Sequence, residues 1–146
     1  QPSRIEVSNR NLGLVELDPR LIRTTQTTIK QQGETLPALV ESMKKNGFVV
    51  EPDRLIDVVR MPDGQLTSLD TTRILAADRA GINVQARLWE HTDLLPDDVQ
   101  FVSRFIGRKG EVPVTFGDAV MNRIGRQNGA YPKLYPYGSP YAGTKY

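Results

Sequence analysis

The sequence predicts an α+β domain in which helices pack on a small mixed sheet. The chain has 146 residues, of which 38% are hydrophobic and 25% are charged, a composition typical of one compact domain with its own core. Residues 55–61 and 82–89 alternate apolar and polar side chains as strands do, and segments with helical periodicity lie around them.

The predicted organisation has three parts. Residues 1–34 form an N-terminal segment of strands and polar residues, and residues 35–127 form the core with a helical C-terminal extension. Residues 128–146 form a strap rich in tyrosine and proline.

Two short strands, 12–17 and 20–22, are predicted in the N-terminal segment, with Asp18 and Pro19 as the turn between them. The run RTTQTTIK follows at residues 23–30. Threonine is common on edge strands, so a strand with one polar face is the simplest interpretation of this run.

A helix is predicted over residues 36–46. Thr35 can cap its start, and Gly47 supplies the residue that ends it. Four apolar residues recur at helical spacing on one face: Leu36, Leu39, Val40 and Met43.

A hairpin and a second helix come next. Residues 55–61 and 65–69 are the predicted strands, because the intervening Pro-Asp-Gly is a turn sequence. Asp70 is placed to cap a helix over residues 71–80, and the strand 82–89 follows.

The helical extension contains two further predicted helices, one opened by Pro96 and one capped by Thr115. All five tyrosines lie in residues 131–146, and the run YPKLYPYGSPY is too rich in proline for regular helix or central strand. This tail is either a strap over the domain or a flexible end that binds a partner. The strap is the preferred interpretation, because tyrosine clusters are rarely left in solvent.

The composition excludes several classes of site. The chain has no cysteine and one histidine, so disulfides, thiol nucleophiles and metal sites built on several Cys or His are excluded. No apolar run has the length of a membrane span. The net charge is +2, but residues 51–100 carry −5 and residues 101–146 carry +5. The basic end either tracks phosphates or is ordinary solubilising charge.

The strongest local signal for a site is the start of the helix at residues 71–80. Thr71 and Thr72 open this helix, where backbone N–H groups and the positive end of the dipole favour a phosphate. Arg73 can bind the same phosphate with its planar guanidinium. Asp70 is interpreted first as the helix cap, and an acid or base role is compatible with that position.

Two further groups of residues are candidates for the same site. In RTTQTTIK, Arg23 can bind phosphate while Thr25, Gln26 and Thr27 orient it. His91 can carry a proton, because its ordinary pKa lies near neutrality, although a lone histidine in a surface loop needs no role. A basic face on or beside the last two predicted helices either tracks phosphates, binds an acidic immunity protein or is an ordinary solvated surface. Its residues are Arg104, Arg108, Lys109, Arg123 and Arg126.

Residues 36–90 resemble the ParB/sulfiredoxin-like domain. The likeness lies in the order helix, glycine, strand, Asp-Gly turn, D-x-x-R, Ala-Ala, glycine and strand. In this family such a segment holds a nucleotide or phosphate, which assigns Asp70 and Arg73 the acidic and basic places. Thr71 stands where the family has glycine, and the sulfiredoxin cysteine is absent.

The motifs of the whole chain are also similar to the ParB-like toxin domains at the C-termini of Rhs and contact-dependent inhibition (CdiA-type) polypeptides. They are RTTQTTIK, LVESMKKNGF, DVVRMPDGQLTSLDTTRILAADRAGI, GDAVMNRIGRQN and YPYGSPY. The resemblance implies a nuclease that is secreted within a larger effector, acts in the cytoplasm of a target bacterium and is neutralised by a cognate immunity protein.

RNA is favoured over DNA as substrate, because metal ligands are sparse in the sequence. We therefore expect no metal and no other cofactor. The alternative is a toxin that hydrolyses or transfers phosphoryl from ATP or a similar nucleotide, in which case Mg²⁺ is expected. A DNA-binding module of the ParB kind is a third interpretation, and it predicts binding without toxicity.

Overall fold

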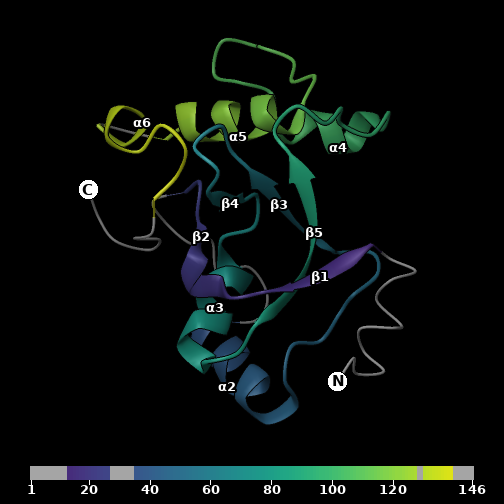
Figure 1. Ribbon diagram of the computed structural model, residues 1–146, viewed down its shortest axis with the longest axis vertical. Coiled ribbons are helices and arrows are strands. Elements are labelled where there is room, and N and C mark those ends of the chain that lie inside the picture. The colour runs from purple at the N-terminus through teal and green to yellow at the C-terminus, as the bar shows by residue number, and fades with distance from the viewer. Residues whose placement is uncertain (1–12, 27–34, 128–129, 140–146) are drawn as a thin grey trace.

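The computed structural model describes residues 13–26, 35–127 and 130–139. Within these residues a mixed five-stranded sheet has the order β1-β5-β3-β4-β2 (Figure 1). The strands are β1 (Leu14–Leu17), β2 (Ile22–Arg23), β3 (Ile56–Arg60), β4 (Leu66–Ser68) and β5 (Val84–Glu90).

The central strand β3 pairs with β5 in parallel and with β4 in antiparallel register. At the edges, β1 is antiparallel to β5 and β2 is parallel to β4. The predicted hairpin is confirmed as β3 and β4, and Gly64 lies in its turn with a φ of +83°, which favours glycine. The predicted α+β class with a small mixed sheet is therefore confirmed.

Helices α2 (Leu36–Asn46) and α3 (Thr72–Ala80) cover one face of the sheet. The first core lies beneath them and contains Ile56 and Val58 of β3. The predicted bounds of α2 are confirmed, with Thr35 accepting the backbone N–H of Ala38 at 3.3 Å.

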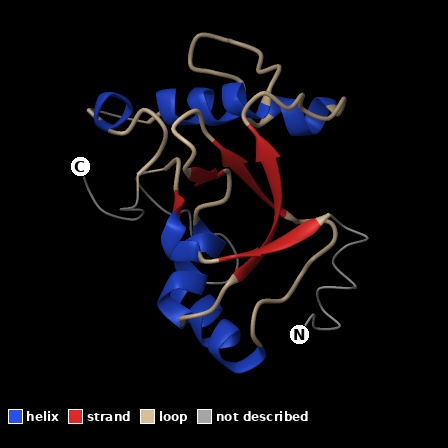
Figure 2. Cartoon of the chain, in the orientation of Figure 1, coloured by secondary structure: helices blue, strands red, loops and turns tan. Residues whose placement is uncertain are grey.

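The opposite face is covered by α4 (Val99–Ser103), α5 (Phe116–Gly125) and α6 (Tyr131–Leu134). Figure 2 shows the strands between the two groups of helices. The second core has these members: Val59, Met61, Leu69, Phe105, Phe116, Ala119, Val120, Ile124 and Tyr131. Because β3 alternates its side chains, Val59 contributes to this core while its neighbour Val58 contributes to the first.

Some boundaries differ from the prediction. Residues 20–22 are not one strand, because Pro19–Leu21 form a 3₁₀ turn, η1, and β2 begins at Ile22. The carboxylate of Asp18 accepts the N–H of Arg20 at 2.9 Å, which favours this turn over an extended chain. The strand predicted over residues 23–30 ends at Arg23, with Thr24 in an isolated bridge, and residues 27–30 lie outside the described residues.

In the helical extension, α4 begins after Asp98 and not at Pro96. The carboxylate of Asp98 accepts the N–H groups of Gln100 and Phe101, so it defines the first turn. The helix predicted after Thr115 is confirmed as α5, with a reciprocal cap between Thr115 and Asp118.

The described part of the tail, residues 130–139, lies against β2 and β4. It contains one helical turn, α6, which was not predicted; Pro132 is tolerated there because the first turn of a helix needs no N–H partner. The hydroxyl of Tyr131 donates to the carbonyl of Thr24 at 2.9 Å, and Thr24 exchanges two backbone hydrogen bonds with Ser139. In the described ranges, no helix combines the length and apolar character needed to cross a membrane.

Candidate phosphate-binding site

A pocket of about 240 Å³ lies at the start of α3. Three segments line it: the turn before β3 with Asp53, the connection from Leu69 to Arg73, and the end of α4 with Arg104 and Phe105. The pocket therefore forms where β4, α3 and the helical extension meet, and we call it the α3 pocket.

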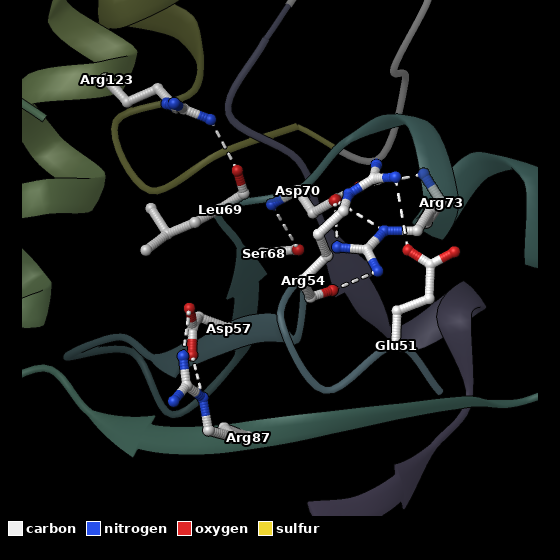
Figure 3. Close-up of polar contacts among 9 residues, drawn as sticks. All are labelled: Glu51, Arg54, Asp57, Ser68, Leu69, Asp70, Arg73, Arg87 and Arg123. Atoms are coloured by element: carbon white, nitrogen blue, oxygen red, sulfur yellow. Dashed lines mark hydrogen bonds and ion pairs between the residues drawn. The ribbon is translucent and has the colours of Figure 1, made fainter. Parts of the chain in front are cut away.

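Asp70 and Arg73 form an ion pair in the α3 pocket (Figure 3). One oxygen of Asp70 accepts the backbone N–H of Arg73 at 2.9 Å, and the other accepts its Nε at 2.9 Å and pairs with its Nη2 at 2.9 Å. The Nη1 of Arg73 donates to the carbonyl of Arg54. These contacts hold the guanidinium in one orientation and leave two of its five N–H groups for another acceptor.

The helix cap is formed differently from the prediction. The structure places Thr71 at the cap position without a side-chain hydrogen bond, and α3 begins at Thr72. Asp70 caps the helix from one residue earlier, by accepting the N–H of Arg73. Since both of its oxygens are bound by Arg73, the structure favours a positioning role for Asp70 over proton transfer.

Thr71 and Thr72 differ in their exposure to solvent. Thr71 is only 2% exposed and does not line the α3 pocket, and its hydroxyl has no hydrogen-bond partner among the described residues. Thr72 is half-buried at the first position of α3. Of the two, only Thr72 has solvent exposure at the helix start.

Asp57 of β3 also lines the α3 pocket and was not singled out from the sequence. Its carboxylate accepts Nε and Nη2 of Arg87 at 2.7 and 3.1 Å and the indole N–H of Trp89 at 3.0 Å. Trp89 in turn stacks on Phe116 with ring centroids 4.3 Å apart. A charged residue among the apolar side chains of residues 55–59 was the available signal, but its partners depend on the pairing of β3 with β5.

Arg104, just after the end of α4, lines the α3 pocket. The guanidinium of Arg104 lies 5.1 Å from the ring centre of Phe105 and 5.8 Å from that of Phe101. Within the described parts of the chain Arg104 makes no ion pair. Its guanidinium packs on aromatic rings and can still bind an anion.

Arg123 is mostly buried and donates to the carbonyl of Leu69 at 2.6 Å. Burial, followed by repulsion from Arg104, lowers the pKa of Arg123 to about 10, which still leaves it charged near neutral pH. It therefore supports the α3 pocket from behind and does not belong to the solvent-exposed basic face that the sequence suggested.

The predicted contribution of RTTQTTIK is divided between two places. Arg23 binds Asp63 through both Nη atoms, at 2.7 and 3.1 Å, and Thr67 through Nε at 3.1 Å. This ion pair lies at the hairpin end of β4, whereas Asp70 follows the other end of that strand. Arg23 is thus already paired and is not brought to Arg73.

Thr25, in the same run, lies closer to the α3 pocket. The hydroxyl of Thr25 is fully buried and donates to the carbonyl of Ser68 at 3.5 Å, two residues before Asp70. Gln26 is half-buried. Thr27 lies outside the described residues.

The ion pair of Arg23 and Asp63 predicts a pH dependence of stability. Hydrogen bonding from Arg23 holds the pKa of Asp63 below its ordinary 3.8, so the pair stabilises the fold above that pH and is lost as the pH falls through the lowered value. We expect Asp63→Asn to lower the free energy of unfolding by up to about 1 kcal/mol at neutral pH. Urea unfolding of both proteins over a series of pH values from about 7 down to about 2 measures this, and a difference that does not shrink as the pH falls contradicts it.

His91 is placed away from Asp70 and Arg73. Its ring Nδ1 lies 3.1 Å from the carbonyl of Arg60, which can only accept, so Nδ1 carries the proton. The backbone N–H of His91 bonds the same carbonyl, whereas Leu69 bonds the carbonyl of Asp57. These two points on β3 are three residues, or about 10 Å, apart. The structure does not bring the predicted proton carrier to the α3 pocket.

Comparison with models of known protein families and with curated proteins finds no match to this chain. Among the described residues, no three Asp, Glu or His side chains are grouped as metal ligands would be.

Proposed function

We propose that this chain is a toxin domain that binds and cleaves RNA in the cytoplasm of a target bacterium. The toxin class, its delivery within a larger secreted effector, its neutralisation by a cognate immunity protein and the ParB/sulfiredoxin-like identity of its core rest on the sequence resemblance described above. The cleavage of RNA rests on the groups that line the α3 pocket.

The observation that carries this proposal is that two arginines and one carboxylate of the α3 pocket, Arg73, Arg104 and Asp53, can still bind a ligand. Arg73 has two N–H groups to donate, and Arg104 has no anionic partner in the described residues. Asp53, which also lines the α3 pocket, likewise makes no ion pair within the described residues, whereas Asp57 and Asp70 are bound by arginines. Cations beside a carboxylate suit a phosphodiester whose neighbouring hydroxyl must lose a proton.

The size of the α3 pocket favours a nucleic acid over a free nucleotide. Sites that enclose small ligands usually have volumes of about 300–1,000 Å³, and 240 Å³ is smaller than that range. A phosphate and its sugar fit such a space while the rest of the strand stays outside. The α3 pocket is too small to enclose a whole triphosphate nucleotide.

The proposed reaction uses the 2′-hydroxyl of RNA. The 2′-oxygen attacks phosphorus while Asp53 accepts its proton, the bond to the 5′-oxygen breaks, and that oxygen takes a proton from water. The products are a 2′,3′-cyclic phosphate and a 5′-hydroxyl. Arg73 and Arg104 stabilise the charge that develops on the phosphoryl oxygens, and Asp70 positions Arg73.

Incubation of the purified chain with bacterial RNA, genomic DNA and ATP, in parallel, tests the proposal. We expect RNA fragments ending in 2′,3′-cyclic phosphate, intact DNA and intact ATP. Growth arrest with RNA loss is expected when the chain is expressed in bacteria. Hydrolysis of ATP with Mg²⁺ and intact RNA would instead support the nucleotide-using alternative, and DNA cleavage would overturn the choice of RNA.

Replacing Asp53 is expected to reduce the rate of RNA cleavage, whereas replacing His91 is not. Asp53→Asn is expected to reduce kcat by about 10²–10⁴-fold with little change in KM, because a proton acceptor is removed. His91→Ala is expected to retain the wild-type rate, because His91 lies at the far end of β3. The matched control is Asp97→Asn, an exposed carboxylate that does not line the α3 pocket. Loss of activity in His91→Ala with unchanged folding would return histidine to the mechanism.

A further inference from the structure

A second pocket, of about 450 Å³, lies between the end of α4 and the end of α5. Its lining residues are Ser103, Ile106, Gly107, Arg108 and Arg126. We call it the arginine groove. Two cations and no carboxylate line it, so its chemistry favours an anion.

Arg108 is held in place on one wall of the groove. Its Nη2 donates to the carbonyls of Arg126 and Gln127 at 2.8 and 3.2 Å, at the negative end of α5. The carboxylate of Glu111, which lies beside Gly107, accepts the backbone N–H of Lys109 at 2.8 Å and does not line the groove. The guanidinium groups of Arg108 and Arg126 are therefore not neutralised by an acidic residue of the lining.

The arginine groove and the α3 pocket lie on either side of the four-residue segment 103–106. Arg104 and Phe105 line the α3 pocket, and Ser103 and Ile106 line the groove. Arg104, which packs on the ring of Phe105, therefore stands on the ridge between the two concavities. Each concavity is thus lined by two arginines, Arg73 and Arg104 in the α3 pocket and Arg108 and Arg126 in the groove.

We propose that the arginine groove binds a phosphate next to the one in the α3 pocket, so that the substrate is a single strand of RNA that crosses the ridge at Arg104. This inference rests on the proposed function and specifies its substrate. A strand that enters two small concavities on either side of four residues must turn sharply. A flexible single strand makes such a turn, whereas the backbone of a duplex is too stiff.

Binding of a 2′-O-methyl RNA oligonucleotide, measured by fluorescence anisotropy, tests the groove without cleavage. We expect Arg108→Gln/Arg126→Gln to raise Kd by about tenfold or more at low salt. Two lost phosphate contacts are also expected to reduce the slope of log K against log salt by about 1.4, since each contact on a single strand contributes about 0.7. Arg126→Gln alone is included because the Arg108 side chain also anchors α5.

The matched control is Lys44→Gln/Lys45→Gln, which removes the same charge from exposed positions on α2. It is expected to bind nearly as wild type, and equal weakening in both double variants would overturn the groove as a specific contact. Equal affinity of the wild type for duplex RNA would overturn the single-strand inference.

Cleavage separates this inference from the proposed function. The groove double variant is expected to cut a long RNA with raised KM and to cut a dinucleotide, too short to reach the groove, at the wild-type rate. If the groove variant behaves as wild type while Arg73→Ala is inactive, the groove is wrong and the nuclease stands. If the wild type binds the oligonucleotide through the groove but cuts no RNA, the nuclease is wrong and the groove stands.

Discussion

Replacing Arg73 with alanine is expected to reduce RNA cleavage by about 10²–10³-fold, as the loss of one fixed donor to a developing charge does. Three contacts hold this guanidinium, two from Asp70 and one from the carbonyl of Arg54. A donor held in advance needs little reorganisation during the reaction, so the effect is expected mainly on kcat. Initial rates over a range of RNA concentrations measure it.

Arg79→Ala is the matched control, because Arg79 is an exposed arginine near the other end of the same helix. It is expected to cleave at the wild-type rate. Arg73→Lys is expected to recover little activity, since an ammonium cannot reproduce the planar contact with Asp70 and the carbonyl of Arg54. Wild-type activity in Arg73→Ala, with the fold intact by circular dichroism, would exclude the α3 pocket as the active site.

Replacing Tyr131 with alanine is expected to lower the free energy of unfolding by about 3–5 kcal/mol, the usual cost of removing a large buried aromatic. Tyr131 has no exposed surface and lies in the second core. Its hydroxyl also donates to the carbonyl of Thr24, next to β2. The change therefore leaves a cavity under α5 and removes a contact between the tail and the sheet edge.

Urea unfolding distinguishes these two contributions. Tyr131→Phe keeps the ring and is expected to lose about 1 kcal/mol, the net value of one hydrogen bond. Lys133→Ala, an exposed residue of the same helical turn, is expected to be neutral. A loss below about 1 kcal/mol for Tyr131→Ala would contradict the assignment of the tail to the core.

Local patterns predicted the elements whose causes are local. The helix α2 has its own cap at Thr35 and its own apolar stripe, and its bounds were correct. The hairpin of β3 and β4 follows from a turn that favours glycine at position 64. The start of α4 was wrong because both Pro96 and Asp98 are plausible first residues, and the hydrogen bonds made by Asp98 decide between them.

In the candidate site, too, contacts between residues close in the chain differ from contacts between distant residues. Asp70 and Arg73 were both placed at a helix start from the sequence, but Arg73 was assigned to a phosphate, and its ion pair with Asp70 three residues earlier was not predicted. Arg23 was expected beside them, but its partner Asp63 lies 40 residues away and is brought to it by the pairing of β2 with β4. His91 was expected there too, and the direction of β5 takes it to the opposite end of β3.

The α+β class, the helix α2, the hairpin of β3 and β4 and the place of Asp70 and Arg73 at a helix start were predictable, because each follows from patterns among residues close together in the chain. Which distant charges meet depends on how the strands and helices pack. The contact of Asp57 with Arg87 follows from strand register, and the ridge at Arg104 follows from packing of the helical extension on the sheet. Such contacts join segments far apart in the chain, and no local spacing specifies them.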